Sequence, residues 1–267
     1  MIINDFDIEQ IAESGECFRW KKIKDKHYSG IIGKNYCEVW QDGKNVEFSG
    51  ISQEKFNYYF DLERDYSKIK EYYMNDEILK KAIGFGEGIR ILNQDKFETL
   101  ISFIISANNN IPRIRKSVEK ISKKYGDEIG DGLYAFPTPF QLSNATEEEL
   151  METGVGFRAK YIVNTCKAIV NGINLDELSE LPTKECKKEL MKLMGVGPKV
   201  ADCVMLFSMG KTDAFPVDVW IKRIMESLYI KQEMSLNQIQ KYAEEKFGEY
   251  AGIAQQYLFF YARDNLK

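Results

Sequence analysis

The chain has 267 residues, of which 44% are hydrophobic and 29% are charged. This length and composition fit one large domain or two modest ones with a real core, and they exclude an intrinsically disordered chain. The formal net charge is −4 and the isoelectric point is near 5.4, so nucleic acid could be bound only through local patches and oriented backbone dipoles.

The N-terminus and the cysteines restrict the compartment and the cofactors. Residues 1–16 lack the basic and apolar regions of a signal peptide, and the longest apolar stretch, 100–107, is too short to span a bilayer. We therefore expect a cytoplasmic protein, associated with the nucleoid if the source is bacterial, and no membrane partner. The five cysteines are scattered without a C-x-x-C pair, and His27 is the only histidine. This pattern argues against a disulfide framework, a zinc site and an iron–sulfur cluster.

The first 60 or so residues have the texture of short β-strands. Aromatic and β-branched runs alternate with turn residues, and the Asp42-Gly43 pair is a strong hairpin signal. The expected strands are 17–20, 28–32, 37–40 and 45–48.

From about residue 52 the pattern becomes helical. Apolar residues at i, i+3, i+4, i+7 and i+8 from Phe97 to Ile105 predict an amphipathic helix that ends in three asparagines, 108–110. Helical segments continue to the C-terminus, with turns at 136–140, 171–174 and 181–182. The glycines in 84–88 follow a helical run rather than a strand, which disfavours a phosphate loop. We predict an α+β fold in which a small antiparallel sheet domain (1–90) packs on a larger helical region (91–267).

Two stretches, 150–162 and 190–203, echo each other with an apolar helix end, a Gly-Val-Gly turn and a new helix. In the second, Val196 is expected to fill the gap between the helices while Gly195 and Gly197 adopt positive φ, and Pro198 suits the first helical position. The free N–H groups of such a turn can hold a DNA phosphate. A turn that merely packs two helices is an equal alternative from the pattern alone.

Lys199 lies in the first turn of the helix that follows. The helix dipole and burial both disfavour an ammonium group there, so Lys199 is a candidate amine nucleophile; the alternative is a surface lysine that extends to water. Cys203 lies one turn further on the same face. Asp218 follows a proline and precedes an apolar-periodic helix, so it is expected as an N-cap that could also face Lys199.

At this point the residues carry a resemblance. GVGPKVADC (195–203) followed by PVDV is similar to the helix-hairpin-helix DNA glycosylases, whose lysine branches have an aspartate 19 residues later, as here (218 − 199 = 19). One branch, the 8-oxoguanine DNA glycosylases, is resembled in order along nearly the whole chain. The matching segments are SGECFRW (14–20), SFIISANNNIPRI (102–114), GVGFRAKYI (154–162) and YAGIAQQYLFF (250–260).

The resemblance implies a repair enzyme that flips oxidised guanine out of duplex DNA. Lys199 would attack the sugar and form a Schiff base, which adds a β-elimination lyase activity, and Asp218 would stabilise the transition state. The Gly15 carbonyl would accept a hydrogen bond from the imidazole N–H that oxidised guanine has and guanine lacks. Phe259 and Cys203 would sandwich the base, and Gln255 would bind its Watson–Crick edge.

The resemblance also implies the remaining contacts. Asn108 would fill the space that the base leaves, Phe157 would wedge into the stack, and Arg113 and Arg158 would contact the orphaned cytosine. The amides of Gly195 and Gly197 in the hairpin (about 184–210) would bind backbone phosphate. The hairpin can bind a cation through the backbone carbonyls of Met191, Leu193 and Val196. No redox or organic cofactor is expected, and the partner is double-stranded DNA bound by a monomer.

Two positions depart from the family pattern. Phe157 stands where eukaryotic members have tyrosine, and Trp220 where a histidine often reaches a phosphate. Three alternatives stay open. The endonuclease III and adenine glycosylase branches usually carry a cysteine cluster near the C-terminus, but this chain has no cysteine after Cys203. The alkylated-base branch lacks the lysine, and a helix-hairpin-helix module that only grips DNA would need neither Lys199 nor Gly15.

Overall fold

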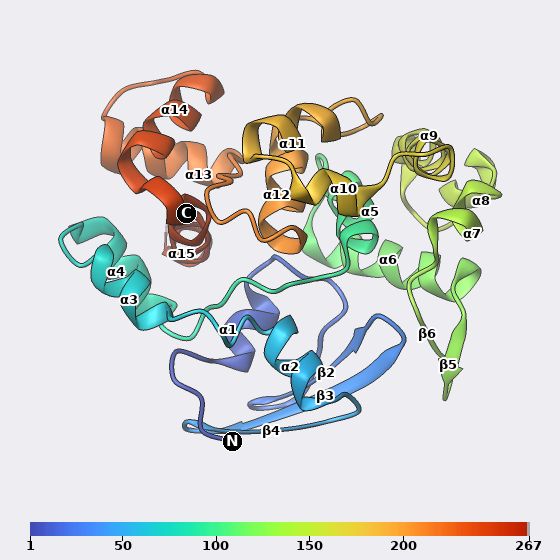
Figure 1. Cartoon of the computed structure of the whole chain (residues 1–267), viewed down its shortest axis with the longest axis horizontal. Helices are drawn as coiled ribbons and strands as arrows, with labels where there is room; N and C mark the ends of the chain where they lie inside the picture. The colour runs from blue at the N-terminus through green and yellow to red at the C-terminus, as the bar shows by residue number, and fades with distance from the viewer. Residues whose placement is uncertain (266–267) are drawn as a thin grey trace.

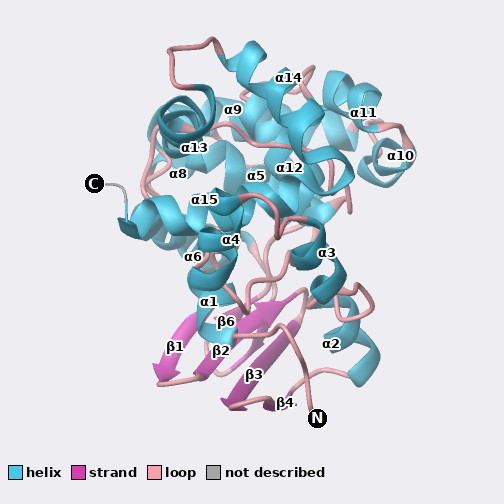
Figure 2. Ribbon diagram, turned by 90° about the vertical axis from the view of Figure 1, so that its left-hand side faces the viewer, coloured by secondary structure: helices cyan, strands magenta, loops and turns pink. Residues whose placement is uncertain are grey.

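The computed structural model describes residues 1–265 as an antiparallel sheet with a mass of helices above it (Figures 1 and 2). The predicted α+β architecture is thereby confirmed. The four strands pair in sequence order: β1 (Lys21–Lys24), β2 (His27–Ile32), β3 (Asn35–Asp42) and β4 (Asn45–Ser49). Val39 of β3 pairs with Tyr28 on one side and Phe48 on the other. Asp42 pairs with Asn45 and Gly43 has a φ of 56° between them, so the predicted hairpin turn is confirmed.

The expectation of a strand at residues 17–20 was wrong. These residues are irregular, and the first strand begins at Lys21. The reason is that neighbouring side chains in this segment serve two different cores: Cys17 and Trp20 are buried beside the sheet, whereas Phe18 is buried among the helices. A strand would place side chains alternately on two faces of one sheet, which this arrangement does not allow.

One helix, α1 (Ile8–Glu13), precedes the sheet, and the rest follow it. The following helices are α2 (Gln53–Tyr59), α3 (Tyr66–Tyr72), α4 (Glu77–Phe85), α5 (Lys96–Ser106), α6 (Ile111–Tyr125), α7 (Pro139–Ser143), α8 (Glu147–Met151), α9 (Ala159–Val170), α10 (Leu175–Glu180), α11 (Thr183–Leu190), α12 (Pro198–Ser208), α13 (Val219–Ile224), α14 (Leu236–Phe247) and α15 (Ala251–Asn265). Short 3-10 turns lie at η1 (Gly156–Arg158) and η3 (Gly248–Tyr250), and a π-helix at η2 (Met225–Ile230). Within residues 1–265, no helix has the length and apolar character needed to cross a bilayer.

A second small sheet, of β5 (Glu128–Gly130) and β6 (Leu133–Tyr134), was not predicted. Its strands have three and two residues, too few for an alternating pattern to be recognised.

Helix α5 is the central helix rather than a surface one. Its periodic apolar positions were predicted correctly, but Thr99, Ser102 and Phe103 are buried as well, so eight of its eleven residues are inaccessible. Helix α12 packs along it, and α6 and α9 cover other faces. The C-terminal end of α5, where Ser106 and Ala107 are half-buried, lies next to the start of α12.

Packing divides the chain into two cores. One lies between the sheet, α1 and α2 and contains Trp20, Tyr28 and Phe60; the other is formed by the helices. Helices α3 and α4 fall before the predicted domain boundary at residue 90, yet their buried residues belong to the helical core. The hydroxyl of Tyr73, at the end of α3, donates to the Phe247 carbonyl at 2.7 Å, which ties α3 to α14.

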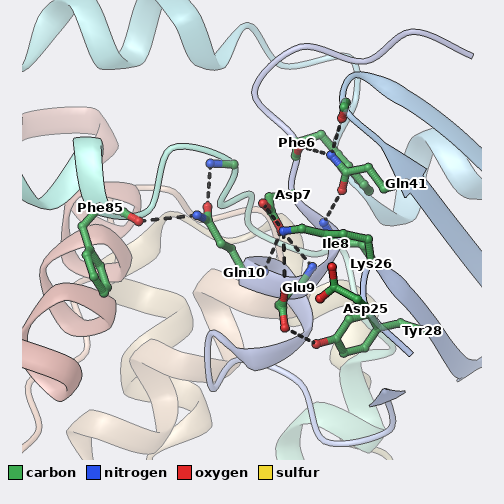
Figure 3. A network of polar contacts seen from close by, with 12 residues as sticks. Phe6, Asp7, Ile8, Glu9, Gln10, Asp25, Lys26, Tyr28, Gln41 and Phe85 are labelled. Carbon is green, nitrogen blue, oxygen red and sulfur yellow. Dashed lines mark hydrogen bonds and ion pairs between the residues drawn. The ribbon is translucent and has the colours of Figure 1, made fainter. Parts of the chain in front are cut away.

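Polar contacts fix α1 between the sheet and the loop after α4 (Figure 3). The Asp7 carboxylate caps α1 and accepts a hydrogen bond from Lys26 Nζ at 2.7 Å. The side chain of Gln41 binds the backbone on both sides of Asp7, and Gln10 Oε1 accepts from the Gly88 amide at 2.7 Å. Segment 84–88 thus packs against α1, and α1 in turn positions the chain that follows it, including Gly15.

Candidate active site

The hairpin consists of α11, a turn and α12. Gly195 has a φ of 85° and a Cβ there would lie 2.7 Å from Tyr161 Cβ on α9, so this position requires glycine on two grounds. Val196 is buried as predicted, and Pro198 is the first helical residue. The prediction of positive φ at Gly197 was wrong: its φ is −92° with ψ −179°, because the chain enters α12 through an extended N-cap.

The earlier Gly-Val-Gly turn leads into α9, the helix that packs against the hairpin. Gly154 and Gly156 both have positive φ, at 90° and 58°. Gly156 differs from Gly197 because it begins the 3-10 turn η1 instead of a helix cap. Thr165 on α9 donates its hydroxyl to the Met194 carbonyl at 3.0 Å, which joins α9 to the hairpin.

The Lys199 side chain turns inward from the start of α12. It is half-buried, its Nζ donates to Ser106 Oγ at 3.2 Å, and the Nζ lies 4.8 Å from the centre of the Phe103 ring. Both contacts belong to α5. The alternative of a surface lysine extended into water therefore does not describe this residue.

Asp218 caps α13, as predicted from the sequence. Its Oδ1 accepts from the amides of Trp220 and Ile221 at 3.0 and 2.9 Å. Burial raises the pKa of Asp218, whereas these amides and the nearby charge of Lys199 act to lower it. Both of these hydrogen bonds are made to Oδ1, so Oδ2 is left outside the cap for other chemistry.

Cys203 is buried one turn after Lys199. Burial raises the pKa of its thiol to about 12, so the thiol is neutral and offers an apolar surface rather than a nucleophile. Its predicted partner in the base sandwich, Phe259, is half-buried on α15. A Cβ at Gly15 would lie 3.1 Å from Phe259 Cε1, so Gly15 packs directly on the ring edge, with a φ of 91°. The sandwich of a base between Cys203 and Phe259 stays a prediction.

Gln255 lies one turn before Phe259 on α15. Only 4% of the residue is exposed, yet its Oε1 is buried without a hydrogen-bond partner among residues 1–265. An orphaned buried acceptor costs about 1–3 kcal/mol, which a bound N–H donor would recover.

The residues predicted to fill the vacated space, to wedge into the base stack and to contact the orphaned cytosine gather around the end of α5. Asn108 has a φ of 51° and is exposed, Arg113 is exposed on the first turn of α6, and Phe157 is 59% exposed. Arg158, in contrast, is buried: its guanidinium donates to the carbonyls of Ala107 at 2.8 Å and Asn108 at 2.9 Å. In this form Arg158 braces the Asn108 turn, and its contact with a cytosine stays a prediction.

Several residues that support the site were missed from the sequence. Ser106 holds Lys199, and Gln256 donates to the Ser14 carbonyl at 3.4 Å beside Gly15. Gln256 could have been found from the sequence, since it is one of two consecutive glutamines within the apolar stretch 251–260. Trp220, one of the departures from the family pattern, lies 5.3 Å from the Arg223 guanidinium, so a positive charge is present beside it.

The fold and this set of residues define a helix-hairpin-helix DNA glycosylase. Residues 101–249 match the HhH-GPD superfamily of base excision DNA repair proteins, and residues 2–100 match the N-terminal domain of 8-oxoguanine DNA glycosylase. The chain therefore belongs to the 8-oxoguanine DNA glycosylase family.

Individual relatives are similar to this chain over most of its length. A probable N-glycosylase/DNA lyase of Methanothermobacter thermautotrophicus is 30% identical over 98% of this chain and 95% of its own. The Arabidopsis thaliana N-glycosylase/DNA lyase OGG1 is 35% identical over 92% of this chain and 74% of its own. The Clostridium acetobutylicum 8-oxoguanine glycosylase/lyase, solved with DNA containing cytosine opposite 8-oxoguanine, has a TM-score of 0.94 and 48% identity over 98% of this chain and 93% of its own.

Proposed function

We propose that this protein excises 8-oxoguanine from duplex DNA and then cleaves the strand at the resulting site. The observation that carries the proposal is the inward Lys199 side chain, held by Ser106 of α5 beside the carboxylate that caps α13. A lysine in a packed site next to a carboxylate is the arrangement that nucleophilic attack on a sugar requires.

Each group has a defined task in the chemistry. The Lys199 nitrogen attacks C1′ of the extruded nucleotide as the N-glycosidic bond breaks. The electrons of that bond leave with the base, which takes up the proton that the attacking nitrogen releases. Asp218, whose Oδ1 is fixed by two amides, stabilises the positive charge that develops on the sugar. The sugar ring then opens to an imine on Lys199, which makes the C2′ proton acidic, and loss of that proton expels the 3′ phosphate.

Recognition of the base falls to the N-terminal segment and α15. The Gly15 carbonyl accepts a hydrogen bond from the imidazole N–H that 8-oxoguanine has and guanine lacks. Guanine would instead place an acceptor nitrogen against this carbonyl oxygen, which is unfavourable. The unpaired Oε1 of Gln255 is suited to the N–H donors of the Watson–Crick edge. Gly15 packs against the edge of the Phe259 ring, and this ring offers a surface on which the extruded base can stack.

Binding to the DNA backbone needs positively charged side chains, and in this acidic protein such side chains cluster on one helix. Helix α6 begins beside Asn108 and presents exposed basic residues at i, i+3, i+7 and i+10, namely Arg113, Lys116, Lys120 and Lys123. This spacing places them along one face of the helix. The amides at Gly195 and Gly197 and the start of α12 add a second phosphate site.

The hairpin turn also has carbonyl groups suited to a cation. The Met191 and Val196 carbonyls accept no hydrogen bond within residues 1–265, whereas the Leu193 carbonyl accepts one from the Val196 amide at 3.1 Å. A cation held there would help to anchor a phosphate; the base-removal chemistry itself needs no redox or organic cofactor. We further place the protein in the cytoplasm, acting as a monomer, on sequence grounds alone.

The test is covalent trapping with borohydride on a duplex containing one 8-oxoguanine. The wild-type protein should form an adduct, Lys199→Gln should form none, and Lys160→Gln, which changes an exposed lysine on α9, should trap normally. Absence of any wild-type adduct would favour a module that only binds DNA. Retention of the adduct in Lys199→Gln would assign the nucleophile elsewhere.

A further inference from the structure

Glu16 follows Gly15 directly and is almost completely buried, with 1% exposed. Its Oε2 accepts a hydrogen bond from the Leu92 amide at 3.2 Å, and its Oε1 lies 3.3 Å from Ser14 Oγ. No lysine or arginine pairs with it within residues 1–265. Burial of an ionised carboxylate without a cation costs free energy of folding, so burial favours the protonated form of Glu16.

The protons of this cluster can be counted. Ser14 has a single hydroxyl proton, and that proton is directed at the Ile11 carbonyl, 2.8 Å away. Ser14 Oγ then has only lone pairs left, and it already accepts from the Glu16 amide at 3.4 Å. With the hydroxyl in that orientation, the contact between Ser14 Oγ and Glu16 Oε1 requires that Glu16 carries a proton and donates it. An ionised Glu16 can accept from Ser14 only if the hydroxyl turns away from the Ile11 carbonyl.

The surroundings favour the same neutral form. Burial, with a smaller effect of the Asp61 carboxylate, raises the pKa of Glu16 to about 8 even though the contacts with Leu92 and Ser14 act to lower it. The other titratable groups that face it, the Cys17 thiol and the Tyr59 hydroxyl, are buried and have raised pKa values, so they are neutral too. Glu16 is thus an uncharged acid at neutral pH.

The contacts of Glu16 and Ser14 lie on the two sides of Gly15. The Glu16 carbonyl accepts from Gln94 Nε2 at 2.9 Å, and the Ser14 carbonyl accepts from Gln256 Nε2 at 3.4 Å. The Glu16 carboxyl group joins Glu16 to Ser14, the residues on either side of Gly15. The positive φ of Gly15 helps to set the direction of the Gly15 carbonyl.

We propose that Glu16 is a positioning residue that works as a neutral acid and holds the Gly15 carbonyl where it reads the oxidised base. This proposal rests on the proposed function. Ionised Glu16 is a buried charge without a cation, and it draws the Ser14 hydroxyl away from the Ile11 carbonyl, so the segment 14–16 is released. Base recognition then fails while Lys199 and its sugar chemistry, on the other side of the site, are unaffected.

The experiment compares two activities of the full-length protein from pH 6.5 to 9.5: excision of 8-oxoguanine and cleavage at a preformed abasic site. Both activities use Lys199, so effects on the sugar chemistry cancel in the ratio of their kcat/KM values. For the wild type the ratio should fall about tenfold per pH unit above pH 8. In Glu16→Gln, a neutral isostere, the ratio should be independent of pH. Glu98→Gln, which changes a half-buried carboxyl on α5, should behave as the wild type.

The same pH-dependent fall in Glu16→Gln, or a flat ratio in the wild type, overturns the proposal. Ser14→Ala tests it without changing residue 16: removal of the acceptor should lower the ratio several-fold at pH 7, and an unchanged ratio counts against it. Carbon-13 NMR of the Glu16 carboxyl, assigned by its loss in Glu16→Gln, should show titration near pH 8; titration near 4.5 overturns the neutral acid. If the wild type cleaves abasic sites but never excises 8-oxoguanine, the proposed function fails, and the NMR titration still decides the state of Glu16.

Discussion

The two glycines of the hairpin give a matched pair of variants. Gly195 and Gly197 are two residues apart in one turn, but only Gly195 has positive φ, and only there would a Cβ collide with α9. We predict that Gly195→Ala destabilises the protein strongly, whereas Gly197→Ala does so little. The comparison isolates backbone strain and close packing from any general effect of adding a methyl group to the turn.

The magnitude follows from two costs. An alanine in the left-handed region costs roughly 1–2 kcal/mol. A Cβ placed 2.7 Å from Tyr161 Cβ and 2.8 Å from its ring forces α9 and the hairpin apart, and overpacking of this kind costs roughly 1–3 kcal/mol. Together they lower the free energy of unfolding by about 3 kcal/mol. Gly197 has room for a Cβ and an extended backbone, so its change should stay under about 1 kcal/mol.

Urea denaturation followed by far-UV circular dichroism measures both variants against the wild type. Gly195→Ala should shift the midpoint clearly to a lower urea concentration. In a thermal melt of the same variant, the melting temperature should fall by roughly 9 °C. Similar losses in the two variants would contradict the reasoning, because the argument depends on the difference between the two φ values. Truncation of Tyr161 in the Gly195→Ala background should recover part of the loss if the collision is real.

Two further predictions concern DNA. Gln255→Ala and Phe259→Ala should each weaken binding to a duplex with 8-oxoguanine by about 1–3 kcal/mol, measured by fluorescence anisotropy. Binding to undamaged duplex should change little. An equal loss of affinity for both duplexes would mean that these residues have only a structural role. Replacement of Lys116, Lys120 and Lys123 by glutamine should reduce the slope of log K against log salt concentration by about 2–3 on both duplexes. As a control, the same replacement of three exposed lysines on α4 and α14 should leave this slope unchanged; these are Lys80, Lys81 and Lys241.

Much of the fold could be predicted because its signals are local. The Asp42-Gly43 turn and the period of α5 are written within a few residues, and both were confirmed. The segment 17–20 could not be predicted, since its conformation depends on two cores that form from distant parts of the chain. Gly197 shows the same limit within one motif: whether a glycine takes positive φ depends on how the next helix is capped.

The candidate site divides in a similar way. Lys199 and Asp218 carry their chemistry in the residue types and in their places at two helix starts, so sequence reasoning reached them. Their supports were invisible, because Ser106 meets Lys199 across 93 positions and Gln256 meets Ser14 across 242. The burial of Arg158 is another such case, since nothing in its sequence neighbourhood indicates that its guanidinium binds the end of α5.

Three consecutive residues at the end of α5 connect functions that the sequence presents as separate. Ser106 accepts from the Lys199 amine, and the next two carbonyls, of Ala107 and Asn108, accept from the Arg158 guanidinium. A displacement of this turn therefore changes the position of the nucleophile and frees or holds the arginine at the same time. The group that attacks the sugar and the group predicted to contact the opposite base thus share one support. That support is firm because α5 is buried on most of its faces and its far end is capped by Asp95.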